Sequence, residues 1–115
     1  MPVSNPVQLV LQVLRERHGQ LTEADAAALL QLSPVRFRHI FKRDAQMSFR
    51  SARLRAKLSY GAHLLRTTDL AIPEVSDRLG YAERCKFEKA FKAVYAITPT
   101  GFRAREADGQ SLQIA

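Results

Sequence analysis

The sequence predicts an all-α protein of about seven helices, in which two helix-turn-helix subdomains are joined by a long central helix. Three observations support this prediction. The stretch 48–67 has apolar residues on two opposite faces, short segments with clear helix-start signals flank it, and these flanking segments repeat at an offset of about 50 residues. At 115 residues, the chain can form two small lobes that share a buried helix, but not two large domains.

The first lobe is expected over residues 5–47 and begins with two helices. Asn5-Pro6 is an N-cap followed by proline in the first turn, and the apolar stripe after it ends at His18-Gly19. Thr22 is the expected N-cap of a second, alanine-rich helix that reaches Leu30.

A third helix completes this lobe after a tight turn at Gln31-Leu32. Ser33-Pro34 is a strong helix start. The expected inner face of this helix is centred on Phe37, Ile40, Phe41 and Asp44. Helix, short turn, helix is the outline of a helix-turn-helix.

The linker helix is expected over residues 48–67, with Ser48 as its N-cap. A helix on a single core has one apolar stripe, but this one has two. The stripes are Leu54, Leu58, Gly61 and Leu65, and Phe49, Ala52, Ala56, Tyr60 and Leu64. We therefore expect a lobe on each side of a helix roughly 28 Å long, at 1.5 Å per residue.

The second lobe is expected over residues 68–106. After a break at Thr68, Pro73 opens a short helix that ends at Gly80, and the next helix spans about residues 82–95. Thr98-Pro99 starts a last short helix that runs through Phe102 and Arg103. The pattern fades from residue 104, so residues 107–115 are expected to be a disordered tail.

An internal repeat relates the two lobes. VRFRHIFK at 35–42 aligns with CKFEKAFK at 85–92, so that Phe37 corresponds to Phe87 and Phe41 to Phe91. The offset is 50 for these helices and 49 for the helices before the turn, which gives the second turn one extra residue. Two copies of one supersecondary unit therefore flank the linker helix.

The charge is concentrated as well as large. The chain has a net charge of +7, and residues 33–66 contain nine basic residues and a single acid, Asp44, for a net charge of +8. A solubilising surface is one interpretation, but such a concentration more often indicates a polyanion partner. A helix lying on a membrane surface would need a wide apolar face with Trp or Phe, which the linker helix lacks.

Other classes find little support in the composition. No apolar run is long enough to span a bilayer, and no signal peptide is visible. A lone cysteine excludes an internal disulfide and a multi-thiolate zinc site and fits a reducing cytoplasm. The three histidines have no ligand spacing, so we expect no metal and no cofactor.

The helix after each turn presents a polar outer face. These faces are Val35, Arg38, His39 and Lys42 in the first copy, and Cys85, Glu88, Lys89 and Lys92 in the second. A recognition helix lays such a face in the major groove, and the linker helix is nearly as long as one DNA turn of about 34 Å. This arrangement predicts two successive major-groove contacts on one side of a duplex, for which a monomer suffices.

Residues 33–103 resemble the DNA-binding domain of the AraC/XylS family of bacterial transcription regulators. The resemblance rests on SPVRFRHIFK at 33–42, MSFR at 47–50, IPEV at 72–75, LGY at 79–81, KFEKAFK at 86–92 and ITPTGFR at 97–103. It implies that residues 1–115 are a single DNA-binding domain that binds promoters sequence-specifically and usually activates transcription. The resemblance also implies that the protein is cytoplasmic, that it is associated with the nucleoid through DNA binding, and that RNA polymerase is a further partner. Many members carry a separate ligand-binding or dimerisation domain ahead of this one, so a stand-alone regulator and a fragment both remain open.

The resemblance assigns roles to individual residues. The positions that contact bases are Val35, Arg38, His39, Arg84, Cys85, Lys86 and Lys89. Arg38 could contact guanine through two hydrogen bonds, or bind phosphate only. We assign the backbone phosphates to Ser33, Arg36, Lys42, Arg43, Arg50, Lys57, Lys92 and Thr98.

Two residues of the second reading face have competing interpretations. Glu88 could accept a hydrogen bond from cytosine, or form an i,i+4 ladder with Arg84 and Lys92; we prefer the ladder, because phosphates repel a free carboxylate. Cys85 beside basic residues suggests redox control, but the chain has no resolving cysteine, so a small residue that touches a base or fills space is the simpler account.

The chain also departs from the family pattern. Gln46 and Ala96 stand where members usually carry glycine, so each is expected to have a positive φ at a cost on the order of 1 kcal/mol. Ala82 replaces the usual N-cap serine, so Glu83 can start the helix instead. Ala52-Arg53 replaces an aromatic-leucine pair, which trims the apolar packing of the linker helix.

Two other functions compete with DNA binding. A basic helical module that binds an acidic protein would favour aromatic hot spots on the outer faces, where Arg, Lys and His stand instead. An enzyme such as a thiol-based DNA repair protein would need a base beside Cys85, and the sequence offers neither that pairing nor a phosphate-cradling glycine loop. We therefore predict no enzymatic activity.

Overall fold

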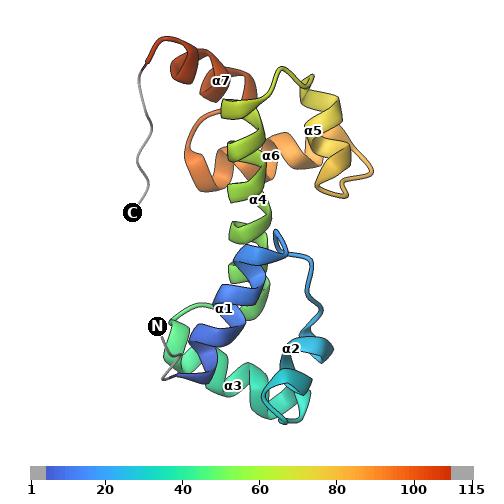
Figure 1. Ribbon diagram of the computed structural model, residues 1–115, viewed down its shortest axis with the longest axis vertical. Coiled ribbons are helices and arrows are strands. Elements are labelled where there is room, and N and C mark those ends of the chain that lie inside the picture. The colour runs from blue at the N-terminus through green and yellow to red at the C-terminus, as the bar shows by residue number, and fades with distance from the viewer. Residues whose placement is uncertain (1–4, 110–115) are drawn as a thin grey trace. The chain divides into compact units, whose positions relative to one another are not determined.

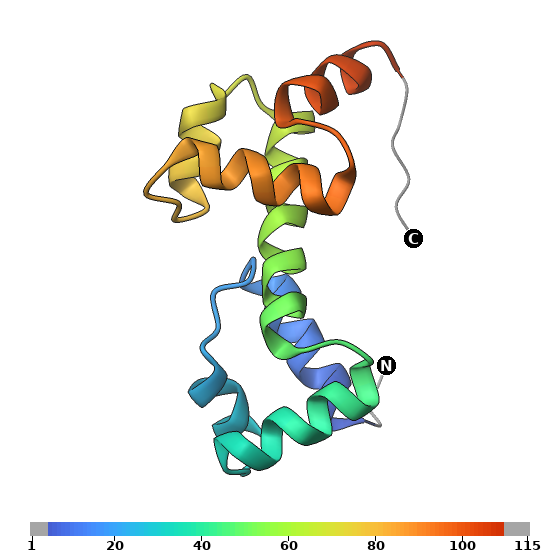
Figure 2. The same cartoon turned by 180° about the vertical axis from the view of Figure 1, so that it is seen from behind.

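The computed structural model describes residues 5–109, which form seven α-helices and no strand (Figures 1 and 2). The helices are α1 (Pro6–Glu16), α2 (Glu23–Leu29), α3 (Pro34–Ala45), α4 (Phe49–Thr67), α5 (Ile72–Arg78), α6 (Arg84–Tyr95) and α7 (Pro99–Ala107). The chain divides into two compact units, and the boundary falls between Lys57 and Leu58, inside α4. The prediction of an all-α fold with two helix-turn-helix subdomains and a long central helix is confirmed.

Side chains cap the helices where the sequence indicated. A side-chain oxygen accepts a hydrogen bond of 2.9–3.2 Å from a backbone N–H two or three residues further along at Asn5, Thr22, Ser33, Ser48 and Thr98. Each bond satisfies a donor that the first turn of a helix leaves without an intrahelical partner. Local sequence is therefore sufficient to fix the starts of α1, α2, α3, α4 and α7.

Several helix boundaries differ from the expectation by a few residues. α5 begins at Ile72, one residue before Pro73, and α6 begins at Arg84 with Glu83 as its N-cap, which is nearer to the alternative start at Glu83 than to Ala82. The Glu83 side chain makes no capping hydrogen bond to the first turn of α6, so no side-chain cap fixes an earlier start of this helix.

The end of α7 is the larger correction. α7 continues to Ala107, four residues beyond Arg103, so the helix extends past the point at which the apolar pattern fades and one residue into the expected tail. Residues 104–107 are good helix formers, and the Arg103 side chain anchors this helix to α4. The rest of the expected tail, residues 110–115, lies outside the described residues.

Three phenylalanine rings form the centre of the first unit. Phe37 and Phe41 of α3 and Phe49 of α4 lie with ring centroids 5.4–5.7 Å apart. Around them pack apolar residues of α1, α2 and α4, including Val7, Val10, Leu14, Ala26, Ala27 and Ala52. Ala52 of α4 is buried in this core, to which α4 contributes one of the three rings, that of Phe49.

The expected inner face of α3 extends one position too far. Phe37 and Phe41 are fully buried and Ile40 is half-buried, but Asp44 lies at the surface. The Asp44 carboxylate accepts a 2.9 Å hydrogen bond from Nε of its neighbour Arg43. An ionised carboxylate remains in water beside a cation because burial would remove its hydration.

The second unit repeats the aromatic centre with different residues. Phe87 and Phe91 of α6 have ring centroids 5.8 Å apart, and Phe102 of α7 lies 5.4 Å from Phe91. Gly61 of α4 faces this cluster, because a Cβ atom placed there would lie 2.9 Å from Cδ1 of Leu79. The absence of a side chain at Gly61 lets Leu79 and Phe87 pack directly against the α4 backbone.

Every residue of the two predicted stripes of α4 is buried or half-buried. Phe49 and Ala52 lie in the core of the first unit, whereas Leu58 and Leu65 are buried in the second. Each unit therefore takes its share of apolar contacts from its own half of α4.

Candidate nucleic-acid interface

The two helix-turn-helix turns share one hydrogen-bond pattern. In the first, the Leu32 N–H donates to the Ala27 carbonyl at 3.0 Å, and in the second the Tyr81 N–H donates to the Ser76 carbonyl at 3.1 Å. The residue before each donor has a positive φ, which is 57° at Gln31 and 88° at Gly80. Gln31 adopts the conformation for which glycine is usually selected, so the first turn keeps the same geometry without glycine.

Both helices after these turns end with a left-handed residue. Gln46 follows α3 with φ 59° and Ala96 follows α6 with φ 63°, as predicted. In each case the N–H of this residue donates to a carbonyl four residues back, at Lys42 and Lys92. The strain is therefore retained at the same position of both units.

The predicted reading face of α3 is open to solvent. Arg38, His39 and Lys42 are exposed, and Val35 is one of the few large apolar residues at the surface, with 55% of its area accessible. Because Phe37 and Phe41 anchor the opposite face in the core, these four side chains lie on the outer face of α3. An exposed Val beside cations suits contact with a thymine methyl group.

One candidate on this face has a partner that the sequence analysis missed. Nη1 of Arg38 lies 2.7 Å from Oε1 of Glu23, the first residue of α2. The two residues are 15 positions apart, so no helical spacing could indicate the contact. The only available signal was an acid in the first turn of the helix that precedes the reading helix.

The predicted reading face of α6 is also exposed. Arg84, Cys85, Lys86 and Lys89 all lie at the surface, and Cys85 is a free thiol. Nε of Arg84 lies 3.3 Å from Oε1 of Glu88, which is the first step of the expected i,i+4 ladder. Nζ of Lys86 lies 3.6 Å from Oε2 of Glu83.

The phosphate candidates are accessible with one exception. The exposed members are Ser33, Arg36, Lys42, Arg43, Arg50, Lys92 and Thr98. Lys57 is half-buried, and this burial lowers the pKa of its ammonium, with repulsion from Arg53 adding to the effect. Lys57 is therefore the phosphate candidate least suited to act as a solvated cation.

Arg43 differs from the other cations because it carries its own counter-charge. The hydrogen bond and charge of Asp44 raise the pKa of Arg43, and the hydrogen bond from Arg43 lowers the pKa of Asp44. Both groups stay ionised at neutral pH, so the pair contributes little net charge to a phosphate contact.

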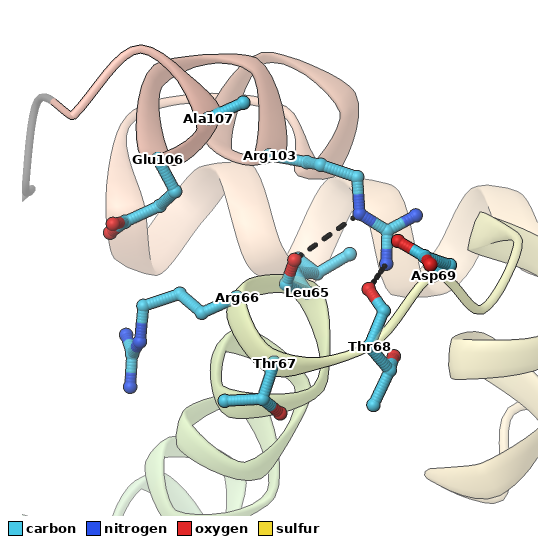
Figure 3. Close-up of a pocket in the computed structure, with 8 residues that line it drawn as sticks. All are labelled: Leu65, Arg66, Thr67, Thr68, Asp69, Arg103, Glu106 and Ala107. Carbon is cyan, nitrogen blue, oxygen red and sulfur yellow. Dashed lines mark hydrogen bonds between the residues drawn. The ribbon is translucent and has the colours of Figure 1, made fainter.

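A pocket of about 420 Å³ lies in the second unit, lined by residues 65–69 and by Arg103, Glu106 and Ala107 (Figure 3). The Arg103 side chain reaches from α7 to the end of α4, whereas Arg66 points away from it (Figure 3). The Arg103 guanidinium donates to the carbonyls of Leu65, Thr68 and Leu70, so it stabilises the end of α4 and is not free to bind an anion.

The described residues provide few other sites. Between residues 5 and 109, no three His, Cys, Asp or Glu side chains cluster in a way that could hold a metal ion. Over the same range, no helix has the length and apolar character to cross a membrane.

Comparison with known proteins agrees with this geometry. A family model described as a helix-turn-helix domain matches residues 26–105. The chain is 30% identical over 106 residues to the arabinose operon regulatory protein of Escherichia coli (strain K12), an alignment that covers 90% of this chain and 36% of that protein. The chain thus spans about a third of the length of the curated relatives that it matches.

Solved structures resemble the chain over most of its length. The C-terminal domain of AraT, a response regulator from Geobacillus stearothermophilus, is 27% identical with a TM-score of 0.75, over 90% of this chain and 88% of that one. A transcriptional regulator with an AraC-type DNA-binding domain, from Chromobacterium violaceum, has a TM-score of 0.81 over 89% of this chain and 92% of that one. At 19% identity, this second likeness shows the fold alone.

Proposed function

Because the chain belongs to the AraC-type family of helix-turn-helix transcription regulators, we propose that it binds a specific promoter sequence in double-stranded DNA as a monomer. α3 and α6 each enter a major groove, and the two grooves follow one another along one duplex. The observation that carries the proposal is the repeated unit, since two equivalent helices each bury two phenylalanines and leave a basic face in solvent.

The roles of the reading residues follow from their chemistry. Arg38 donates two hydrogen bonds to guanine, Val35 contacts a thymine methyl group, and His39 lies beside them on the same face. In the second unit, Arg84, Cys85, Lys86 and Lys89 approach the bases, while the pairing of Glu88 with Arg84 keeps its carboxylate from standing alone near phosphates.

The remaining cations fix the position of the protein on the duplex. Arg36, Lys42, Arg50 and Lys92 are exposed, and within residues 5–109 none of them forms an ion pair like that of Arg43 with Asp44. Ser33 and Thr98 are the N-caps of α3 and α7. The free N–H groups at these helix N-termini suit a phosphate of the DNA backbone.

The regulatory outcome proposed is activation of transcription, with RNA polymerase as a further partner. A protein of this kind works in the cytoplasm on the chromosome. Since both reading helices belong to one chain, DNA binding by this chain requires no second copy.

Selection from random duplexes tests the proposal. We expect enrichment of a site with two half-sites whose centres are about 10–10.5 base pairs apart, one helical turn. Failure to enrich any sequence, with binding to random duplex that weakens only as salt rises, would reduce the protein to a general polyanion binder. No DNA binding at low salt would instead favour the module that binds an acidic protein.

A further inference from the structure

The ion pair between Arg38 and Glu23 joins the two helices of the first helix-turn-helix. Glu23 is the first residue of α2, and its side chain is 34% accessible against 54% for Arg38. The Glu23 side chain is therefore the less exposed of the two. A contact of 2.7 Å between these groups restrains a long side chain that would otherwise sample many rotamers.

This pair leaves the reading chemistry of Arg38 intact. A guanidinium carries five N–H donors in a rigid plane, and Glu23 accepts from one of them, on Nη1. The edge formed by Nε and Nη2 can still donate to O6 and N7 of a guanine. One edge of the group is thus held by the protein while the other can face the bases.

We propose that Glu23 is a specificity-determining residue that positions Arg38 for base reading without touching DNA itself. The proposal rests on the proposed function, because it needs Arg38 to meet a base. A carboxylate near the duplex also repels phosphates. Glu23 therefore weakens binding to DNA of any sequence while it sharpens the choice of one base pair.

The second unit offers no equivalent of this device. At the offsets of the repeat, Glu23 corresponds to Ile72 and Arg38 to Glu88. The acid there pairs with Arg84 of its own helix rather than with a residue of α5. We therefore expect the effect of Glu23 to be confined to the half-site read by α3.

The experiment uses the full chain and the duplex enriched by selection. Dissociation constants are measured for this duplex, for duplexes with single base-pair changes in each half-site, and for a random duplex. The variants are Glu23→Ala, Glu23→Gln, Arg38→Ala and the double variant Glu23→Ala/Arg38→Ala. Asp25→Ala is the matched control, because Asp25 is an exposed acid in the same first turn of α2.

Opposite changes in two measurements identify the positioning role. For Glu23→Ala we expect discrimination at the Arg38 base pair to fall by about 2- to 5-fold, the scale of a partly exposed ion pair, while affinity for the random duplex rises. Glu23→Gln keeps an acceptor oxygen and should retain part of the discrimination. Asp25→Ala should keep all of it, and loss of Glu23 should change discrimination no further once Arg38 is absent.

The contrary results are equally distinct. Unchanged discrimination in Glu23→Ala would overturn the positioning role. An equal loss of discrimination with and without Arg38 would also overturn it, because Glu23 would then act through the stability of α2. Thermal unfolding of each variant separates that case. If the wild-type chain itself shows no preference among duplexes, the proposed function fails and the role of Glu23 fails with it.

Discussion

In the first unit the helix-turn-helix starts are capped by side chains, whereas the second unit has Ala71 and Glu83 at the same repeat positions. Thr22 and Ser33 accept hydrogen bonds from Asp25 and Arg36. Ala71 has no side-chain acceptor, and its own N–H donates to the Glu74 carboxylate at 3.3 Å. The first unit is therefore stabilised more by local contacts within single helices.

The second unit compensates through contacts between distant segments. Arg53 and Arg103 are repeat equivalents, and each donates to a carbonyl that follows or ends a helix. Arg53 donates once, to Gly19 at 3.1 Å, whereas Arg103 donates to three carbonyls, including that of Thr68, which corresponds to Gly19. The difference teaches that one supersecondary unit can keep its geometry with different sets of capping and long-range hydrogen bonds.

The largest effect is expected for Gly19→Ala in the first unit. Gly19 has φ +82°, and a Cβ there would lie 2.8 Å from the Arg53 carbonyl oxygen and 3.0 Å from the Lys57 nitrogen, both backbone atoms. The combined strain should cost about 2–4 kcal/mol of unfolding free energy, measured by urea unfolding. Gly80→Ala is the control, because Gly80 has φ +88° with nothing within 4 Å, and should cost clearly less.

Arg103→Ala should destabilise the chain more than Arg53→Ala. The first variant leaves three carbonyls at the end of α4 without their charged donor, at about 2–3 kcal/mol, whereas the second loses one bond at about 1 kcal/mol. Equal losses in unfolding free energy would remove the claim that the second unit depends more on long-range bonds.

The reading faces are compared by Arg38→Ala and Lys89→Ala. Each should relax preference at one base pair of its own half-site, at about 1–3 kcal/mol of binding free energy in competition measurements. Lys42→Ala is the control, since loss of a phosphate contact weakens binding to all sequences and lowers the salt slope by about one. An equal loss of affinity for all sequences in Arg38→Ala and Lys89→Ala would show that these residues contact the phosphate backbone of DNA rather than bases.

Substitutions at the N-caps of α3 and α6 test whether the first unit gains more stability from side-chain caps than the second. Ser33→Ala should cost about 1 kcal/mol, and Glu83→Ser should gain a similar amount by giving α6 the side-chain bond that α3 has. Glu83→Ser also removes the exposed contact with Lys86, which contributes little. Thermal unfolding measures both, and no gain in Glu83→Ser would mean that the turn before α6 cannot present the hydroxyl.

The smallest effect concerns a buried hydroxyl. Ser76 is 1% exposed and its oxygen has no hydrogen-bond partner, while its repeat equivalent in the first unit is the buried Ala27. Ser76→Ala should therefore raise the unfolding free energy by about 0.5–1 kcal/mol. The converse variant Ala27→Ser should lower stability by a similar amount, and a stabilising result there would contradict this account.

The sequence by itself determined the features that depend on near neighbours. The caps at Asn5, Thr22, Ser33, Ser48 and Thr98 each act over two or three residues, so their positions in the chain were sufficient to place five helix starts. The buried phenylalanine pairs followed from the spacing of apolar residues within α3 and α6, and the left-handed residues Gln46 and Ala96 followed from the family resemblance.

Only the tertiary structure decided which distant residues meet. It brought Glu23 of α2 to Arg38 of α3, and it brought Arg103 of α7 to the carbonyls of Leu65, Thr68 and Leu70. Such contacts depend on how helices pack and on the reach of long side chains. Neither leaves a periodic signal in the sequence, because the partners are 15 to 38 residues apart.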